Sequence, residues 1–289
     1  MVGPGRFDSS RSSPRLYRVN RSRNMSTQTI QPSAVPVADS KSFHALGIRV
    51  DAVQIPDAIA RLEQWIHERG SSRYVAVTGM HGVTESLDDS HFRDVLLAAD
   101  LVVPDGMPLV WLGRWHGYPM RRRVYGPELM DTFCKQTGPR YRHFFYGGAE
   151  GVPERLAEML HQTYGLQIAG TYSPPFRPLT ADEEKQVAEM VNSSEADVLW
   201  VGLSTPKQER WMHAHRDAFR VPVMLGVGAA FDLNLGKLKQ APSWMRENGL
   251  EWLFRLLMEP KRLWKRYLVF GPKFVWNVGL ELTGIKRFS

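Results

Sequence analysis

Five short segments carry polar, acidic or glycine residues directly after an apolar run that is typical of a β-strand. They are residues 78–82, 104–106, 147–151, 202–209 and 226–232. In a parallel α/β sheet, ligands bind beyond the carboxyl ends of the strands. We expect these strands to lie side by side, so that the five segments converge on one site. Their convergence is more informative than any one segment alone.

Asp105 is the strongest candidate for acid–base chemistry. It stands between the strand-like run 101–103 and a second apolar run that begins at Met107. A carboxylate in such surroundings is partly desolvated, which makes it a better base. The alternative is an ordinary turn or helix-cap aspartate that accepts backbone N–H bonds. His81, at the end of another strand, is either a second acid/base or substrate contact, or a helix N-terminal residue that bonds locally.

The loop with Gly147, Gly148 and Gly151 follows a predicted strand and precedes a predicted helix. Glycines there let backbone N–H groups approach a phosphate at the helix N-terminus, although a tight strand-to-helix turn needs the same residues. The spacing GGxxG differs from the dinucleotide fingerprint GxGxxG. Thr171 and Tyr172 stand where a ribose-binding acid would be expected, so a nicotinamide-dependent oxidoreductase is disfavoured.

Basic residues concentrate near the two ends of the chain, which has a formal net charge of +7. Residues 253–289 hold eight basic and two acidic residues, interleaved with Trp, Phe and Tyr. This composition suits an anionic membrane surface, a nucleic acid, or a core of aromatic side chains with snorkelling basic neighbours. Arg255 and Arg262, two helical turns apart, could grip a diphosphate together, although Pro260 interrupts the segment. Lys207 and Gln208 could bind a sugar or diphosphate, or simply start an exposed helix.

Alternating strand and helix patterns supply the frame that positions these residues. The predicted strands cover 74–78, 101–103, 143–146, 166–171, 197–201 and 221–227. The predicted helices cover 55–68, 79–96, 107–115, 126–136, 151–164, 181–192 and 206–215, and two or three more follow residue 249. Strands separated by helices of this length predict a parallel sheet with right-handed crossovers.

The bulk composition is that of a soluble globular protein, with 43% hydrophobic and 23% charged residues. No run of about 18 apolar residues is present, so no membrane span is expected. Residues 1–40 are rich in Ser, Arg, Pro and Gln and are predicted to be disordered. They lack the apolar stretch of a secretory signal, and Met25 could be the actual start of translation. The single cysteine, Cys134, excludes an internal disulfide framework and a cysteine-rich zinc site.

Longer motifs join these features into a recognisable pattern. They are, in order, HFRDVLLAADLVVPDGMPLVW, RVYGPELM, FFYGGAEGVPERLAEML, WVGLSTPKQERW and GVGAAFDLNLGKLKQAPSWMRENGLEWLFRLLMEPKRLWKRY. From about Ala45 to Phe270, the chain that carries them resembles the WecG/TagA/CpsF family of glycosyltransferases. The last two motifs are the most specific.

The resemblance implies an inverting transfer of a sugar from a UDP-sugar to a polyprenyl-diphosphate-linked saccharide, on the cytoplasmic face of a bacterial membrane. It implies no cofactor and no metal ion held by a DXD motif. In agreement, the sequence has no DXD motif, and the pair Asp88 and Asp89 lies in a predicted helix. A retaining hydrolase would want two carboxylates about 5 Å apart, and the sequence offers no obvious pair.

The resemblance also assigns roles to individual residues. It makes Asp105 the general base and Thr78 a second catalytic position, with His81 as a further candidate. It adds Gln208 and Asp232 to the glycine loop of Gly147, Gly148 and Gly151 as the predicted donor-binding residues. It also turns Arg255, Arg262, Lys265 and Arg266 toward the lipid diphosphate. Many family members have an asparagine where this chain has Met80, followed by His81. Either His81 replaces that asparagine or the sugar differs, so N-acetylmannosamine, glucose and other hexoses stay open.

The predicted fold is therefore an α/β fold with a Rossmann-like parallel sheet flanked by helices and a helical, basic and aromatic C-terminal appendage. The predicted domains are a disordered segment 1–40, a glycosyltransferase core 41–248 and a membrane-associating appendage 249–289. The expected partners are a UDP-sugar, a lipid-linked saccharide and the anionic inner face of the cell membrane, with no nucleic acid; a homo-oligomer is compatible with the sequence. The alternative is an α/β nucleotide- or nucleic-acid-binding protein without transferase activity.

Overall fold

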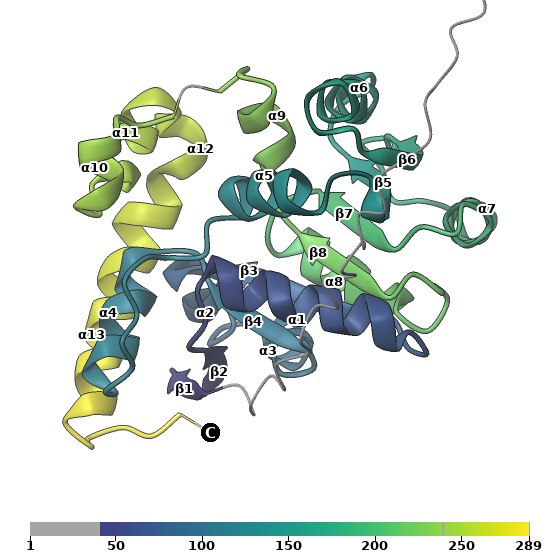
Figure 1. Ribbon diagram of the computed structural model, residues 1–289. Coiled ribbons are helices and arrows are strands. Elements are labelled where there is room, and N and C mark those ends of the chain that lie inside the picture. Colours follow the sequence, from purple (N-terminus) through teal and green to yellow (C-terminus); the bar gives the residue numbers. More distant parts are fainter. Residues whose placement is uncertain (1–40, 239, 289) are drawn as a thin grey trace, which may run out of the picture. The chain divides into compact units, whose positions relative to one another are not determined.

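A six-stranded parallel sheet forms the centre of the computed structural model, which describes residues 41–238 and 240–288 (Figure 1). Its strand order is β4-β3-β8-β7-β5-β6. The strands are β3 (Arg73–Thr78), β4 (Leu101–Pro104), β5 (Arg142–Gly147), β6 (Gln167–Tyr172), β7 (Val198–Gly202) and β8 (Val223–Gly226). All six predicted strands are present, with bounds shifted by at most a few residues. The predicted α/β class with a parallel sheet is confirmed.

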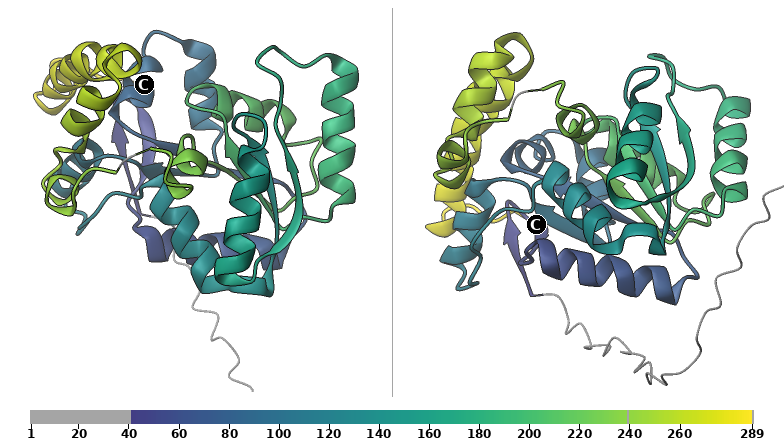
Figure 2. Two further views of the ribbon diagram at one scale, coloured as in Figure 1. Left: turned by 90° about the horizontal axis from the view of Figure 1, so that it is seen from above. Right: turned by 45° about the horizontal axis from the view of Figure 1, so that its top comes forward.

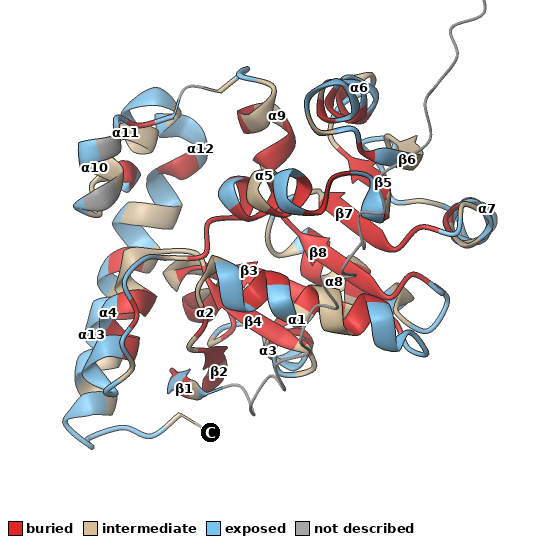
Figure 3. Ribbon diagram, viewed as in Figure 1, coloured by how far each residue is buried: buried red, intermediate tan, exposed pale blue. Residues whose placement is uncertain are grey.

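Alternating side chains of the strands feed two separate cores, one on each face of the sheet. In β3, Tyr74 and Ala76 belong to one core, whereas Val75 and Val77 belong to the other. Helices cover both faces (Figure 2), and the central strands are buried throughout (Figure 3). Burial on both faces explains why these strands read as continuous apolar runs in the sequence.

Most of the predicted helices are present with nearly the predicted bounds. They are α1 (Ile55–Glu68), α4 (Met107–Trp115), α5 (Gly126–Thr137), α6 (Val152–Tyr164), α7 (Ala181–Ser193) and α8 (Lys207–His215). The single helix predicted over 79–96 is wrong, because two helices occupy it: α2 (Met80–Glu85) and α3 (Ser90–Leu97). The side chain of Asp89 accepts a hydrogen bond from the backbone N–H of Phe92 at 2.9 Å and so starts a new helix.

Several short elements were not predicted. Strands β1 (Ser42–Ala45) and β2 (Ile48–Asp51) form an antiparallel hairpin. Leu46 and Gly47 both adopt positive φ at its turn, as a two-residue hairpin loop requires. The 3₁₀ turn η1 (Gly138–Arg140) and helix α9 (Ala230–Asn234) are also new. Elements of three to five residues are too short to show a clear hydrophobic period.

Beyond α9, helices are the only regular elements among the described residues, and the sequence predicted this from residue 249 onward. They are α10 (Ser243–Glu247), α11 (Glu251–Met258), α12 (Pro260–Trp264), the π-helical turn η2 (Lys265–Val269) and α13 (Phe270–Leu282). α13 packs against α2, with Phe274 buried between them and Lys273 paired with Asp88 at 2.6 Å. Glu281 accepts the backbone N–H of Leu46 at 3.0 Å, which ties α13 to the hairpin.

The sequence also predicts a disordered N-terminal segment and no membrane span. The predicted disordered segment 1–40, including Met25, lies outside the described residues. Within residues 41–238 and 240–288, every helix is too short or too polar to span a bilayer.

Candidate active site

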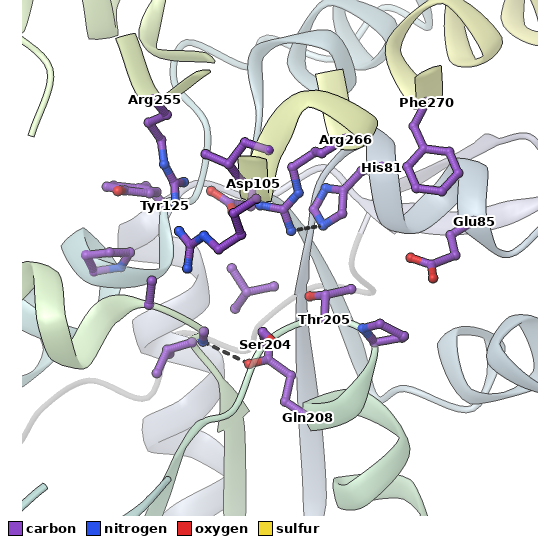
Figure 4. A pocket seen from close by; sticks show the side chains of 18 of the residues that line it. His81, Glu85, Asp105, Tyr125, Ser204, Thr205, Gln208, Arg255, Arg266 and Phe270 are labelled. Carbon is purple, nitrogen blue, oxygen red and sulfur yellow. Dashed lines mark hydrogen bonds between the residues drawn. The ribbon is translucent and has the colours of Figure 1, made fainter. Parts of the chain in front are cut away.

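A cavity of about 320 Å³ opens where four of the six strands end, beneath the appendage (Figure 4). His81 lines it after β3, Asp105 after β4, Thr205 and Gln208 after β7, and Gly228 after β8. Four of the five strand-end segments singled out in the sequence therefore meet at one place. The fifth, the glycine loop after β5, contributes no residue to the lining.

Asp105 combines a buried carboxyl oxygen with a backbone held in place. Its N–H donates to the carbonyl oxygen of Thr78 at 2.8 Å, which joins the ends of β4 and β3. Its Oδ1 is buried and has no hydrogen-bond partner among the described residues. Burial raises the pKa of Asp105 to about 6, although Arg123, Arg255 and Arg266 oppose this effect and Glu251 adds to it. A carboxylate with such a pKa is suited to general-base work near neutral pH.

His81 lies on the cavity wall with Asp105 and contacts the appendage directly. Its Nε2 accepts a hydrogen bond from the guanidinium of Arg266. Desolvation, together with the charges of Arg266 and Arg255, holds the pKa of His81 well below its usual value. The imidazole is therefore neutral at pH 7, and the lone pair of Nε2 is engaged in holding Arg266 rather than free to take a proton.

Thr78 and Gln208 support the cavity floor in different ways. Thr78 is fully buried and does not line the cavity, and its Oγ1 has no partner among the described residues. A Cβ at Gly82 would lie 2.2 Å from that oxygen, so α2 can cover Thr78 only with glycine at this position. Gln208 does line the cavity; its Oε1 accepts the N–H of Gly228 at 2.8 Å, which ties α8 to the loop after β8.

All four predicted cationic residues of the appendage line the cavity: Arg255, Arg262, Lys265 and Arg266. Arg255 and Arg266 are half-buried, whereas Arg262 and Lys265 are exposed at the rim. Arg262 is paired with Glu259 at 2.6 Å. Arg255 and Arg262 line the same cavity, although a new helix, α12, begins at Pro260 between them. Cations gathered on a concave wall suit a diphosphate.

The structure does not bring the glycine loop or Asp232 to the cavity lining. A Cβ at Gly147 would lie 2.6 Å from the carbonyl oxygen of Gly202, and the N–H of Gly148 donates to that same oxygen at 3.0 Å. Close packing against the end of β7 therefore accounts for Gly147, and a φ of +76° together with the nearby Val152 side chain accounts for Gly148. Asp232 belongs to α9 and pairs with Lys237 at 3.6 Å. Lys207 is exposed and also lies outside the lining.

The sequence reasoning missed a buried ion pair beside the candidate base. Arg123, from the segment between α4 and α5, pairs with Glu251 at the start of α11, and its guanidinium lies 4.1 Å from the centre of the Tyr125 ring. Arg123 and Glu251 line a second cavity of about 90 Å³, which Asp105 and His81 also border. Two features of the sequence could have indicated this pair: Arg123 belongs to the RVY motif, and Glu251 is an acid at the start of a strongly basic segment.

Glu209 is a second missed carboxyl, fully buried beneath the cavity. Its Oε1 accepts hydrogen bonds from Thr205 Oγ1 at 2.9 Å and Gln208 Nε2 at 3.0 Å. Burial raises the pKa of Glu209 to about 7. Through these bonds it orients two residues that do line the cavity.

Comparison with known proteins identifies the family of this chain. Residues 43–287 match the model of the Glycosyl transferase WecG/TagA/CpsF family. A relative from Bacillus spizizenii is 30% identical over 227 residues, which cover 78% of this chain and 86% of that protein. One from Bacillus subtilis is 31% identical over 205 residues, covering 70% and 77%. One from Staphylococcus aureus is 25% identical over 243 residues, covering 84% and 94%.

All three relatives carry the name N-acetylglucosaminyldiphosphoundecaprenol N-acetyl-beta-D-mannosaminyltransferase. The family match extends over nearly all of the described chain and includes the appendage. It favours an enzyme over the alternative of a binding protein without transferase activity. The chain belongs to the WecG/TagA/CpsF family and is a glycosyltransferase.

Proposed function

We propose that this enzyme transfers a hexose-type sugar from a UDP-sugar to a polyprenyl-diphosphate-linked saccharide, with inversion and without a bound metal ion. The observation that carries the proposal is the buried carboxyl of Asp105 in a cavity that the arginines of the appendage also line. The named relatives act on N-acetylglucosaminyldiphosphoundecaprenol, and we carry over the class of acceptor. Many family members have an asparagine where this chain has Met80, followed by His81, so we leave the identity of the sugar open.

Asp105 is the proposed base. It accepts the proton of the acceptor hydroxyl while that oxygen attacks the anomeric carbon. The bond from the anomeric carbon to the donor phosphate breaks, and its electron pair leaves with UDP. A single displacement of this kind inverts the anomeric centre and needs one carboxylate, whereas retention would need a second one about 5 Å away. Of the other carboxyls nearby, that of Glu251 pairs with Arg123, and Glu209 lies buried beneath the cavity, where its Oε1 accepts hydrogen bonds from Thr205 and Gln208. Glu85 lines the cavity together with Asp105.

The two diphosphates are proposed to bind on different sides of Asp105. The lipid diphosphate fits the half-buried Arg255 and Arg266 and the rim residues Arg262 and Lys265, since these come from the appendage. We assign the UDP-sugar to the loops after β7 and β8, where Gln208 and Gly228 line the opposite wall. The positive charge of Arg255 and Arg266, which line the same cavity, would stabilise the negative charge of the departing UDP.

An anionic membrane surface is the proposed location, on the cytoplasmic side. The appendage exposes large apolar side chains among its basic residues: Trp252, Leu257, Met258, Trp264, Leu268, Val275, Trp276 and Ile285. Apolar side chains that insert among lipids, flanked by Lys and Arg, are typical of helices that lie on anionic bilayers.

Vesicle sedimentation tests this location. The double variant Leu257→Glu/Trp276→Glu should lose binding to vesicles that contain anionic lipid. Phe176→Glu is the matched control, because Phe176 is fully exposed on the loop between β6 and α7. Unchanged sedimentation of the double variant would show that the appendage is not the membrane contact.

A screen of UDP-sugars tests the activity. UDP release should require a short polyprenyl-diphosphate-sugar acceptor and should continue in EDTA, and the product should have the anomeric configuration opposite to that of the donor. Release that is independent of the acceptor would indicate hydrolysis. Retention of configuration, or loss of activity in EDTA, would refute the proposed mechanism.

A further inference from the structure

Glu251 is a carboxylate that the appendage inserts beside the candidate base. Its side chain is 7% exposed, and it accepts a hydrogen bond from the guanidinium of Arg123, whose side chain is 19% exposed. Arg123, Glu251 and Asp105 line the same cavity of about 90 Å³. The stacking of Arg123 on Tyr125, at 4.1 Å, further restricts where the guanidinium can lie. One guanidinium therefore shares a small cavity with two carboxylates.

The hydrogen bonds show that this competition is resolved in favour of Glu251. Arg123 is the charged group with the largest effect on the pKa of Asp105, yet Asp105 Oδ1 has no hydrogen-bond partner among the described residues. An arginine paired with Asp105 would occupy its lone pairs and stabilise its ionised form. Such a carboxylate would be a weak base. In the structure, the guanidinium of Arg123 pairs with Glu251.

We propose that Glu251 is a positioning residue that holds Arg123 away from Asp105 and thereby leaves the Asp105 carboxylate free to accept the proton of the acceptor. The inference rests on the proposed function, in which Asp105 is the base. Because Glu251 begins α11, the core receives this residue only with the appendage docked. Docking of the appendage therefore completes the cavity and also leaves the Asp105 carboxylate able to accept a proton.

Other charged or titratable groups surround Asp105 from several elements. They are His81 and Glu85 from α2, Tyr125 before α5, Arg246 from α10, Arg255 from α11, Arg262 from α12, and Lys265, Arg266 and Tyr267 from η2. None of them is altered in the variants below. A change in the pKa of Asp105 that depends on the charges of Arg123 and Glu251 can therefore be separated from the effects of these other groups.

The test compares Glu251→Gln, Arg123→Gln and the double variant Arg123→Gln/Glu251→Gln in two measurements. The first is the pH dependence of kcat/KM. The second is direct ¹³C NMR titration of the Asp105 carboxyl, assigned with Asp105→Asn. Glu251→Gln should move the acid limb and the titration down by about one pH unit and lower the plateau rate about tenfold. Arg123→Gln should move both upward.

The double variant distinguishes positioning from general damage. It removes both charges, so its acid limb should return to the wild-type position or above it, which a merely structural role of Glu251 would not produce. Glu281→Gln is the matched control: it removes another appendage carboxylate that contacts the core, at Leu46, far along the chain from the base. Its acid limb should not move.

Several outcomes would overturn the inference. An unchanged or raised pKa of Asp105 in Glu251→Gln would do so, as would an equal shift in Glu281→Gln. If Glu251→Gln does not fold, as judged by circular dichroism, Arg123→Gln and the double variant carry the same test. If the wild-type enzyme transfers no sugar at all, the proposed function fails, while the NMR titration still tests the competition for Arg123.

Discussion

The glycine loop after β5 and the cationic residues of the appendage both looked like phosphate-binding features in the sequence, yet only the second set lines the cavity. The loop packs so closely on β7 that a side chain at Gly147 would overlap the carbonyl of Gly202. Arg255, Arg262, Lys265 and Arg266, by contrast, come together from three consecutive elements onto one concave wall.

The difference follows from the physical reasons for which each residue type is found at its position. A glycine is placed wherever backbones approach closely or φ is positive, so its presence has many causes besides a ligand. A half-buried guanidinium loses hydration that must be replaced. Two of them in one cavity, Arg255 and Arg266, therefore indicate an anionic ligand more specifically than a glycine loop does. Four predictions test this contrast.

The largest effect should follow Asp105→Asn, because the reaction proposed for the cavity depends on this base. Turnover should fall at least about a hundredfold, and UDP binding measured by calorimetry should stay near the wild-type value. Normal turnover would remove Asp105 from the chemistry and would leave the cavity without a base.

Removing one arginine of the appendage should have the next largest effect. Arg255→Ala should raise KM for the lipid-linked acceptor about tenfold or more, and Arg255→Lys should restore only part of the loss, since lysine cannot make the bidentate contact. Arg220→Ala, which alters an exposed arginine at the opposite end of the sheet, serves as the control. Equal KM values in all three variants would show that the appendage does not bind the acceptor.

The pH dependence should reveal the state of Asp105. Since its pKa is raised to about 6, the base is protonated below that value, and kcat/KM should fall about tenfold per pH unit on the acid side. The contribution of Asp105 to stability has the opposite pH dependence. Because the folded state binds this proton more tightly than the unfolded chain does, Asp105 adds to the free energy of unfolding at low pH, and that contribution is lost as pH rises through about 6. Asp105→Asn should therefore raise Tm at pH 7.5. An acid limb near pH 4 would contradict a desolvated base.

The smallest kinetic effect should come from the glycine loop. Gly148 has a φ of +76°, and a Cβ there would lie 3.1 Å from Val152 Cγ1. Gly148→Ala should cost about 1 kcal/mol or more of unfolding free energy, with KM for the donor unchanged. Gly165→Ala, at another positive φ but in open space, gives the cost of backbone strain alone. A tenfold rise in donor KM in Gly148→Ala would restore the loop as a phosphate site.

The strand pattern was predictable because each central strand is apolar on both faces, and the strand-end residues follow those strands directly. The order of the strands places the five ends side by side, as expected from a parallel sheet. The β1–β2 hairpin and the break between α2 and α3 were not predicted, since a four-residue strand and a single capping aspartate leave little trace in a hydrophobic period.

The sequence by itself determined the class of fold, the family and the identity of Asp105 as the candidate base, because local apolar runs and contiguous motifs carry that information. Only the tertiary structure decided which features meet. It brought Glu251 next to Arg123 across 128 positions of sequence and placed residues of α12 at the cavity, and it left the glycine loop outside. The first two outcomes depend on the packing of the appendage and the third on the packing of the loop against β7, and long-range packing is not written in any local spacing of residues.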